Sequence, residues 1–296
     1  MKRNKKHYLP FFVLLFIHSS LLIYTFYKRR DRKLLFITLL SGMGLCFIFE
    51  YFILSQFKAY RYKPMLFKNK DLDNFFGAIM SQAVFVPFTA IFLTAFKVGW
   101  KGKLLFAIFF GLVEKLFLFM GVHKNNWWKT KYTMTLIPIF FYIIDFWYQQ
   151  LRLGTPIFHF SSLFLGVLVN GLNLMYSLSI FRKFRFGLEK WHSWEEHFKI
   201  APIYSFILSA ATTLIIKDNS GWKGVFRSFG FTQIMDMLVL KTGIAKQNFR
   251  HIVINNAIHF SMILWAVLLK RWIYKDVANQ ITRKLKEPAY NVQDPK

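Results

Sequence analysis

Residues 99–127 read GWKGKLLFAIFFGLVEKLFLFMGVHKNNW, and residues 221–249 read GWKGVFRSFGFTQIMDMLVLKTGIAKQNF. The two stretches align without a gap, each opens with Gly-Trp-Lys-Gly, and Glu114 of the first faces Asp236 of the second. Stretches this apolar are typical of membrane helices, where a carboxyl group near the middle needs protein or water around it. The alignment predicts a duplicated unit with an acid kept in both copies.

The composition indicates a membrane protein. Hydrophobic residues make up 55% of the 296-residue chain, and 37 residues are Phe. The segments Tyr8–Tyr27 and Ile157–Phe181 contain no Asp, Glu, Lys or Arg. Uncharged apolar runs of about 18 residues or more favour membrane-spanning helices, which satisfy every backbone hydrogen bond internally.

The predicted fold is an all-α, polytopic membrane helical bundle of about nine transmembrane helices. The expected spans are 8–27, 34–57, 74–96, 103–122, 132–151, 157–181, 200–216, 225–240 and 252–269. The segment 225–240 contains Arg227, Gln233 and Asp236. It either crosses the membrane or only enters it from one side.

A second motif also occurs twice. FKAYRY at 57–62 and FRKFRF at 181–186 share an alternation of aromatic and basic residues. We expect two four-helix membrane repeats, 1–130 and 131–250, followed by a final helix and a basic polar tail at 251–296. An even number of helices in each unit makes the repeats parallel.

The formal net charge of +26 comes mainly from basic residues between the spans, often beside aromatic residues. This placement favours contact with the lipid bilayer and its anionic phospholipid head groups over nucleic-acid binding. The head-group-binding candidates are the basic residues of the two repeated motifs, Lys58, Arg61, Arg182 and Arg185. The alternative is that they anchor the helix ends without selecting a ligand.

Acids inside the expected spans are the candidates for chemistry, because each costs about 2.5–3.5 kcal/mol at mid-membrane on insertion scales. We expect an interior polar site shared by Glu114 and Asp236, with Glu50 or Asp145 as neighbours. Lys115 can reach the interface along its own stem. The alternative is that the acids are buried carboxyl groups that orient helix packing.

Other kinds of site are not predicted. Cys46 is the only cysteine, so neither a disulfide within the chain nor a cysteine-based zinc site can form. WHSWEEHF at 191–198 lacks the H-E-x-x-H order of a helical zinc site, and we expect it to be an interfacial helix. The chain has no phosphate-binding loop, dinucleotide fingerprint or nucleophile elbow, and we predict no cofactor and no metal.

VHKNNWWKTKYT at 122–133, with the acid-bearing helix before it, resembles a family of short multi-pass membrane proteins from spore-forming Firmicutes. The resemblance covers about one repeat unit and implies a bacterial cell membrane and no particular activity. The favoured function is a non-catalytic membrane component for assembly, sensing or lipid organisation. A transporter or channel-like protein is the alternative, and an enzyme acting on lipid head groups is the third choice.

Overall fold

The computed structural model describes residues 7–181, 185–188, 192–219, 221–246 and 252–277. Its helices are α1 (Leu9–Lys28), α2 (Arg32–Glu50), α3 (Lys70–Ile79), α4 (Val86–Ala95), α5 (Trp100–Phe119), α6 (Thr130–Leu153), α7 (Pro156–Ile180), α8 (Trp194–Asp218), α9 (Gly221–Lys241) and α10 (Ile252–Arg271). Three π-helical segments extend or join them: η1 (Tyr51–Gln56) after α2, η2 (Met80–Phe85) between α3 and α4, and η4 (Trp272–Val277) after α10. The described chain thus forms nine helical rods, which fits the predicted number.

Six helical segments in the described residues are long and apolar enough to cross a membrane. They are Leu9–Lys28, Arg32–Gln56, Lys70–Ala95, Pro156–Ile180, Trp194–Asp218 and Val253–Lys275. The chain is therefore an all-helical, multi-pass membrane protein. Helices α5, α6 and α9 would complete the nine expected spans, and their crossing stays a prediction.

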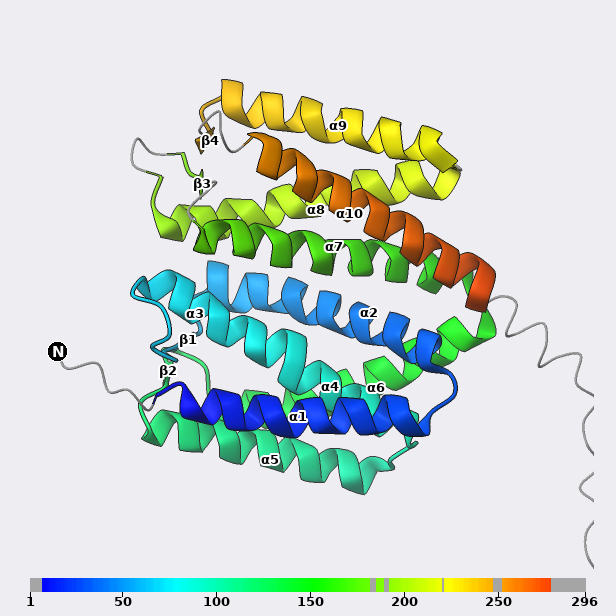
Figure 1. Cartoon of the computed structure of the whole chain (residues 1–296). Helices are drawn as coiled ribbons and strands as arrows, with labels where there is room; N and C mark the ends of the chain where they lie inside the picture. The colour runs from blue at the N-terminus through cyan, green and yellow to red at the C-terminus, as the bar shows by residue number, and fades with distance from the viewer. Residues whose placement is uncertain (1–6, 182–184, 189–191, 220, 247–251, 278–296) are drawn as a thin grey trace, which may run out of the picture.

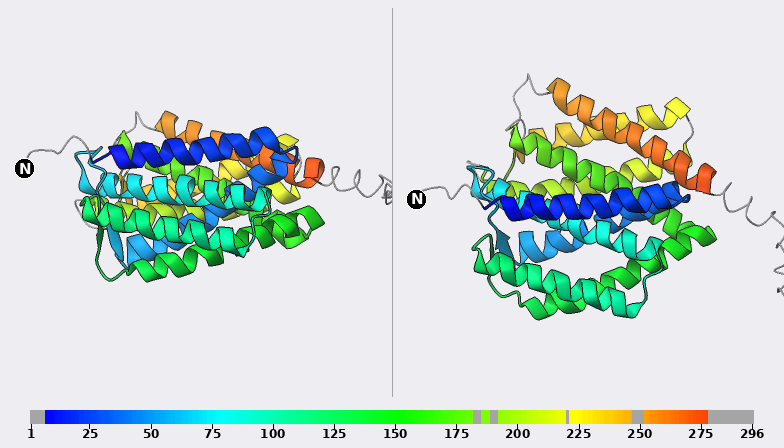
Figure 2. Two further views of the ribbon diagram at one scale, coloured as in Figure 1. Left: turned by 90° about the horizontal axis from the view of Figure 1, so that it is seen from below. Right: turned by 60° about the horizontal axis from the view of Figure 1, so that its bottom comes forward.

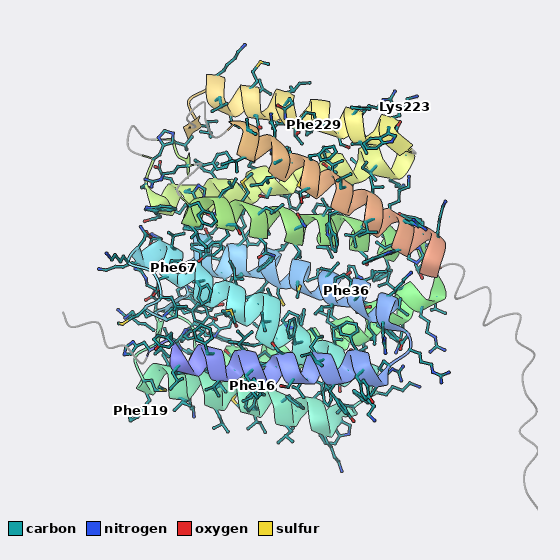
Figure 3. The ribbon with its side chains drawn as sticks, viewed as in Figure 1. Phe16, Phe36, Phe67, Phe119, Lys223 and Phe229 are labelled. Atoms are coloured by element: carbon teal, nitrogen blue, oxygen red, sulfur yellow. The ribbon has the colours of Figure 1, made fainter. Side chains whose placement is uncertain are left out.

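The helices lie side by side along one direction and form two halves (Figures 1 and 2). Helices α1–α6 make up the first half and α7–α10 the second, with α2 packed along α7 between them. At this central contact the Ser41 hydroxyl donates to the Ser162 hydroxyl at 2.8 Å. Large apolar side chains cover the outside: Phe16 on α1 and Phe119 on α5 point away from the bundle (Figure 3), with exposed fractions of 76% and 90%.

The two halves pack alike around their last helix. Helix α6 packs against α2, α4 and α5, while α10 packs against α7, α8 and α9. Helices α5 and α9 run in the same direction, because each leads into a short strand at the same end of the bundle (Figure 1).

Two short antiparallel ribbons close that end. Strand β1 (Tyr60–Tyr62) pairs with β2 (His123–Asn125), and β3 (Arg185–Phe186) pairs with β4 (Ala245–Lys246). Strands were not expected here, although alternation of aromatic and basic residues is the period-two pattern of a strand. In β1 the two tyrosines are buried and the arginine between them is half-buried. The repeated basic–aromatic motifs therefore build ribbons as well as helix ends.

Helix α8 corrects one local expectation. Residues 194–198 are the first residues of α8 and not a separate interfacial helix, and Trp191 lies outside the described residues. The Ser193 side chain accepts the Glu196 backbone N–H, and the Glu196 carboxylate accepts the Ser193 backbone N–H in return. This reciprocal capping satisfies N–H groups that the start of a helix leaves unpaired, and it makes Ser193 the residue that caps the start of α8.

Candidate functional site

The four acids expected to form one polar site lie in three places. Glu50 and Glu114 both lie in the first half, close to Tyr60 on β1. Burial and the charges of both acids raise the pKa of Tyr60. Asp145 on α6 and Asp236 on α9 make their contacts elsewhere. Helices α5 and α9 lie on opposite sides of the bundle (Figure 1). The expectation that Glu114 and Asp236 share one site is therefore corrected: each half has its own acidic cluster.

Glu114 is held by neutral donors from the segment that follows its own helix. Its carboxylate accepts hydrogen bonds from Asn125 Nδ2 at 3.1 Å, from the Thr130 hydroxyl at 2.9 Å, and from the Thr133 hydroxyl. The chain can return to α5 in this way because Gly121 takes a φ of +69°, which a residue without Cβ adopts easily. The acid thus lies between α5, β2 and the first turn of α6.

Glu50 is the more deeply buried acid, with 5% of its surface exposed. Its Oε2 accepts hydrogen bonds from the Tyr60 hydroxyl at 2.6 Å and from Gln82 Nε2 at 3.0 Å. Its Oε1 has no hydrogen-bond partner among the described residues. Helix α2 changes to π-helical geometry directly after Glu50, and Gln82 lies in the π-helical segment η2. Single π-helical turns are frequent at functional sites, because they shift side chains relative to a regular helix.

A cavity of about 430 Å³ extends from this cluster into the first half. This volume lies within the range of small-molecule sites. Polar side chains gather in its lining: Tyr60, Tyr62, Ser81, Gln82, Glu114, His123 and Thr133. The more exposed lining residues are all apolar and lie on α2 and α6: Phe49, Leu136, Ile139 and Ile143. The cavity therefore opens sideways between α2 and α6, on the apolar flank of the bundle.

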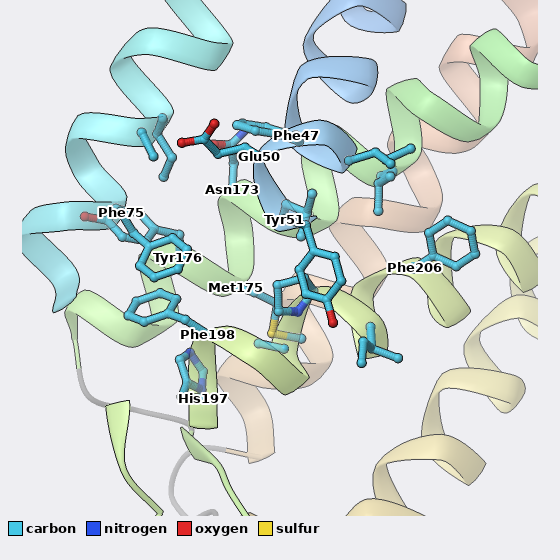
Figure 4. Close-up of a pocket in the computed structure, with 18 of the residues that line it drawn as sticks. Phe47, Glu50, Tyr51, Phe75, Asn173, Met175, Tyr176, His197, Phe198 and Phe206 are labelled. Atoms are coloured by element: carbon cyan, nitrogen blue, oxygen red, sulfur yellow. The ribbon is translucent and has the colours of Figure 1, made fainter. Parts of the chain in front are cut away.

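A second cavity, of about 300 Å³, lies between the two halves (Figure 4). Helices α2, α3, α7 and α8 and the π-helical segment η1 supply its lining, which is almost entirely apolar. The rings of Phe75 and Phe198 stack there with centroids 3.9 Å apart. Glu50 lines this cavity, whereas its two donors, Tyr60 and Gln82, line the first. The carboxyl group thus stands in the wall between the two cavities.

Asp145 is part of an ion pair that the sequence did not reveal. It accepts hydrogen bonds from the buried Lys103 ammonium and, at 2.6 Å, from the Thr94 hydroxyl. The Lys103 ammonium also lies 4.0 Å from the centre of the Tyr142 ring. Lys115, directly after Glu114, is exposed on α5. Lys103 lies near the start of α5, away from the Glu114 end, so Asp145 does not join the Glu114 cluster.

Asp236 lies at the centre of the second half's own cluster. Its carboxylate accepts hydrogen bonds from the Tyr204 hydroxyl on α8 and from Asn255 Nδ2 on α10 at 2.6 Å. The Nε2 atom of His259, also on α10, lies 3.0 Å from Asp236 Oδ2. Asn255 and Thr133 hold the same relation to their acids, since each donates from the helix that follows. Among the described residues, no imidazole makes a hydrogen bond to Glu114.

The described basic candidates lie at the ribbon end of the bundle and make intramolecular contacts. Lys58 pairs with Glu195 at 2.6 Å, and Arg61 pairs with Asp71 at 3.1 Å. The Arg185 guanidinium lies 4.2 Å from the centre of the Trp194 ring. Arg182 lies outside the described residues. Both the Lys58–Glu195 pair and the Arg61–Asp71 pair are solvent-accessible, a setting in which ion pairs add little stability.

His123 lines the first cavity from strand β2. Burial lowers its pKa, against the opposing effect of the Glu114 charge. Its imidazole is therefore neutral at pH 7. The rings of Tyr60 and Tyr62 lie 5.2 and 4.8 Å away between centroids, so the ribbon presents an aromatic wall to the cavity.

The cluster of His and Glu residues at 192–197 serves structure in the described chain. His197 Nδ1 accepts the backbone N–H of Phe186 at 3.1 Å, which ties α8 to strand β3. His192 Nε2 lies 2.9 Å from the Gly243 carbonyl oxygen. Among the described residues no group of three or more His, Cys, Asp or Glu side chains is placed to hold a metal ion.

Comparisons of the chain with protein-family models, with curated proteins and with solved structures each found no match. The functional argument therefore rests on the two cavities, the two acidic clusters and the ribbon end.

Proposed function

We propose that the protein is a non-catalytic membrane component that binds one lipid-like amphiphile in its first half. The apolar chain of the ligand enters between α2 and α6, and its polar end lies against Glu114 and the β1–β2 ribbon. The observation that carries the proposal is the sideways-opening cavity of about 430 Å³, which joins an apolar mouth to a cluster of polar side chains. A bilayer presents amphiphiles to an opening on this flank.

The lining favours a neutral, hydroxyl-bearing head group. Two carboxyl groups, Glu50 and Glu114, lie at or beside the polar end, and an anionic head would be repelled by either when it is ionised. The other polar side chains of the lining are neutral hydrogen-bonding groups, among them Ser81, Gln82 and Thr133. A hydroxyl group can both donate to and accept from such side chains, whereas a carboxylate or a fully ionised phosphate can only accept.

Native mass spectrometry of the protein in detergent, with added 1-monooleoylglycerol, tests the proposal. We expect one bound lipid for the wild type and little for Ile139→Trp, which narrows the mouth. Leu112→Trp is the matched control, because Leu112 is exposed on α5 and does not line the cavity. Equal binding by wild type and Ile139→Trp would overturn the cavity as the site, and tighter binding of oleate would overturn the neutral head group.

The basic ribbon end supports a second part of the proposal. Arg61 in β1 and Arg185 in β3, with Lys58 two residues before β1, lie at the ribbon end of the bundle. This position suits contact with anionic phospholipid head groups at the membrane surface. The membrane would be that of a bacterial cell, as the resemblance of residues 122–133 implies. Binding to phosphatidylglycerol vesicles that weakens in Arg61→Gln/Arg185→Gln would support this contact, and unchanged binding would oppose it.

We infer that the two halves arose by duplication. Each repeat unit begins and ends one helix further along the chain than the units 1–130 and 131–250 expected from the sequence. Units 32–153 and 156–277 each end with the helix that packs on the other three, which leaves α1 as the extra helix. Two glycines 124 residues apart support this division. A Cβ at Gly42 would meet Ile144 on α6 at 3.1 Å, and one at Gly166 would meet Leu269 on α10 at 2.7 Å.

A further inference from the structure

The apolar cavity of about 300 Å³ between the two halves takes no part in the amphiphile site proposed for the first half. The linings of the two cavities share no residue. An engineered cavity of about 150 Å³ in another protein holds one benzene molecule. On that scale the space between the halves has room for roughly twelve carbon atoms, which is a large part of one acyl chain.

The lining of this cavity offers few free hydrogen-bonding groups. Besides Glu50, whose Oε2 accepts two hydrogen bonds, four polar side chains of the lining already make hydrogen bonds within the protein: Tyr51, Asn173, Tyr176 and His197. A polar occupant would leave hydrogen-bonding groups unpaired, which costs free energy. The part of a ligand that this cavity holds is therefore apolar.

The cavity opens on the flank of the bundle, between η1 and α8. Its exposed lining residues are all apolar: Phe52 on η1, and Ile203 and Phe206 on α8. In Figure 4, Phe206 lies on the other side of the pocket from Phe75 and Phe198, whose rings stack. Both η1 and α8 belong to segments that are long and apolar enough to cross a membrane. In a bilayer, this mouth faces the lipid chains.

Two lysines lie beside the mouth, toward the ribbon end of the bundle. Lys199 is one helical turn before Ile203 on α8 and shares its face. Lys199 and Lys58, which follows η1, both pair with the Glu195 carboxylate, at 2.9 and 2.6 Å. These three side chains are solvent-accessible, so the ion pairs are weak. Two ammonium groups share one carboxylate, and an additional phosphate can accept hydrogen bonds from both.

We propose that the cavity between the two halves holds one acyl chain of an anionic phospholipid, whose phosphate binds Lys58 and Lys199. The chain enters between Phe52 and Ile203, and the second chain of the lipid stays in the bilayer. The bound chain fills the space that α2, α3, α7 and α8 enclose. It therefore adds to the packing of α2 on α7, which joins the two halves.

Native mass spectrometry of the full chain in a neutral detergent, with added phosphatidylglycerol, tests this site. We expect one tightly bound phosphatidylglycerol on the wild type. Ile203→Trp, which narrows the mouth, should lose most of it. Ile207→Trp is the matched control and should keep the lipid, because Ile207 is also exposed on α8 but lines neither of the two cavities.

A second pair of variants tests the head group. Phosphatidylcholine serves as the neutral competitor, because its choline offsets the charge of its phosphate. The wild type should prefer phosphatidylglycerol several-fold, and Lys58→Gln/Lys199→Gln should lose this preference. Lys217→Gln, near the other end of α8, should keep it. The two lysines are solvent-accessible, so their replacement tests the site even if Ile203→Trp does not fold.

Two further variants separate this site from the other lipid contacts. Ile139→Trp, which narrows the first cavity, and Arg61→Gln/Arg185→Gln, at the ribbon end, should both retain the bound phosphatidylglycerol. Gel filtration of each variant checks that it is folded. Equal binding by wild type and folded Ile203→Trp, or a wild type without preference for phosphatidylglycerol, would overturn the proposal. Loss of the lipid in Ile139→Trp instead would place it in the first cavity.

Discussion

Arg61 stands directly opposite Lys124 across the β1–β2 ribbon. Like charges in direct opposition weaken a strand pair, so a stable ribbon of this kind needs anions nearby, such as Asp71 or lipid phosphates. In the second ribbon Arg185 stands opposite Lys246 in the same register. Both ribbons lie at one end of the bundle (Figure 1), which predicts that they face the same side of the membrane.

Cysteine labelling of intact cells and of inverted vesicles checks this prediction. Arg61→Cys and Arg185→Cys should react with a membrane-impermeant maleimide from the same side. Lys223→Cys, at the opposite end of the bundle in Figure 3, should react from the other side. Reaction of positions 61 and 185 from opposite sides would mean that the helices between them cross the membrane an odd number of times.

The ion pair of buried Lys103 and half-buried Asp145 predicts that replacing both residues destabilises the protein less than replacing one of them. Removing one partner of a buried ion pair typically costs about 3–5 kcal/mol, whereas replacing both with apolar residues is often neutral. The second half carries Val225 and Val267 at the positions 122 residues later. Lys103→Val alone should therefore lower the thermal unfolding temperature strongly, and Lys103→Val/Asp145→Val should recover most of the loss. A double variant as unstable as the single one would contradict the ion-pair reading.

The sequence predicted the helical class and the position of most helices, because uncharged apolar runs of 20 residues or more leave few alternatives. It also identified Glu50, Glu114, Asp145 and Asp236 as buried or half-buried acids. Their partners were harder to foresee. Lys103 and Asp145 are 42 residues apart, and nothing in either helix alone indicates that their side chains meet.

The ribbons were missed because each strand is only two or three residues long. A usable signal was present: the basic–aromatic motif and the segment after the acid-bearing helix both recur at nearly the same offset. Two motifs that recur together are good candidates for contact in each copy. The cavities could not be predicted in this way, because their linings combine residues from helices far apart in the chain, including the π-helical segments Tyr51–Gln56 and Met80–Phe85.

Gly77 allows strand β1 to approach helix α3. A Cβ at this position would lie 2.4 Å from Tyr62 Cβ, and the Tyr62 backbone N–H is also held by Asn74 Oδ1 at 2.8 Å. Gly77→Ala should therefore push β1 away from α3, at a cost of about 1–3 kcal/mol. The displaced ribbon should also weaken binding of 1-monooleoylglycerol.

Gly230→Ala is the control for this change. Gly230 lies in helix α9, where an added Cβ would meet nothing within 4 Å. Alanine is the better helix former by about 1 kcal/mol, so this variant should be as stable as wild type or slightly more stable. Thermal unfolding in detergent measures both variants. Equal unfolding temperatures for wild type and Gly77→Ala would show that β1 can move without penalty.

His123 links stability of the first half to pH. Burial lowers the pKa of its imidazole below the value of about 6.5 that it has in an unfolded chain. Between these two pKa values the unfolded chain binds a proton that the folded protein does not. Protonation therefore favours unfolding: the contribution of neutral His123 is complete above about pH 6.5 and is lost as the pH falls toward the folded-state pKa.

His123→Ala tests this link. Alanine is the residue at the equivalent position of the second half, because Ala245 on β4 lies 122 residues later. Thermal unfolding is measured in one detergent at several pH values between about 5 and about 7.5, the window that spans the unfolded-state pKa. The wild type should lose stability more steeply on acidification than the variant, even if the variant is less stable at neutral pH. The difference between the two slopes isolates His123 from the other histidines, which both proteins share. Parallel slopes would show that the imidazole is solvated or protonated in the folded protein. The aromatic wall of β1 and β2 would then not exclude water from that side of the cavity.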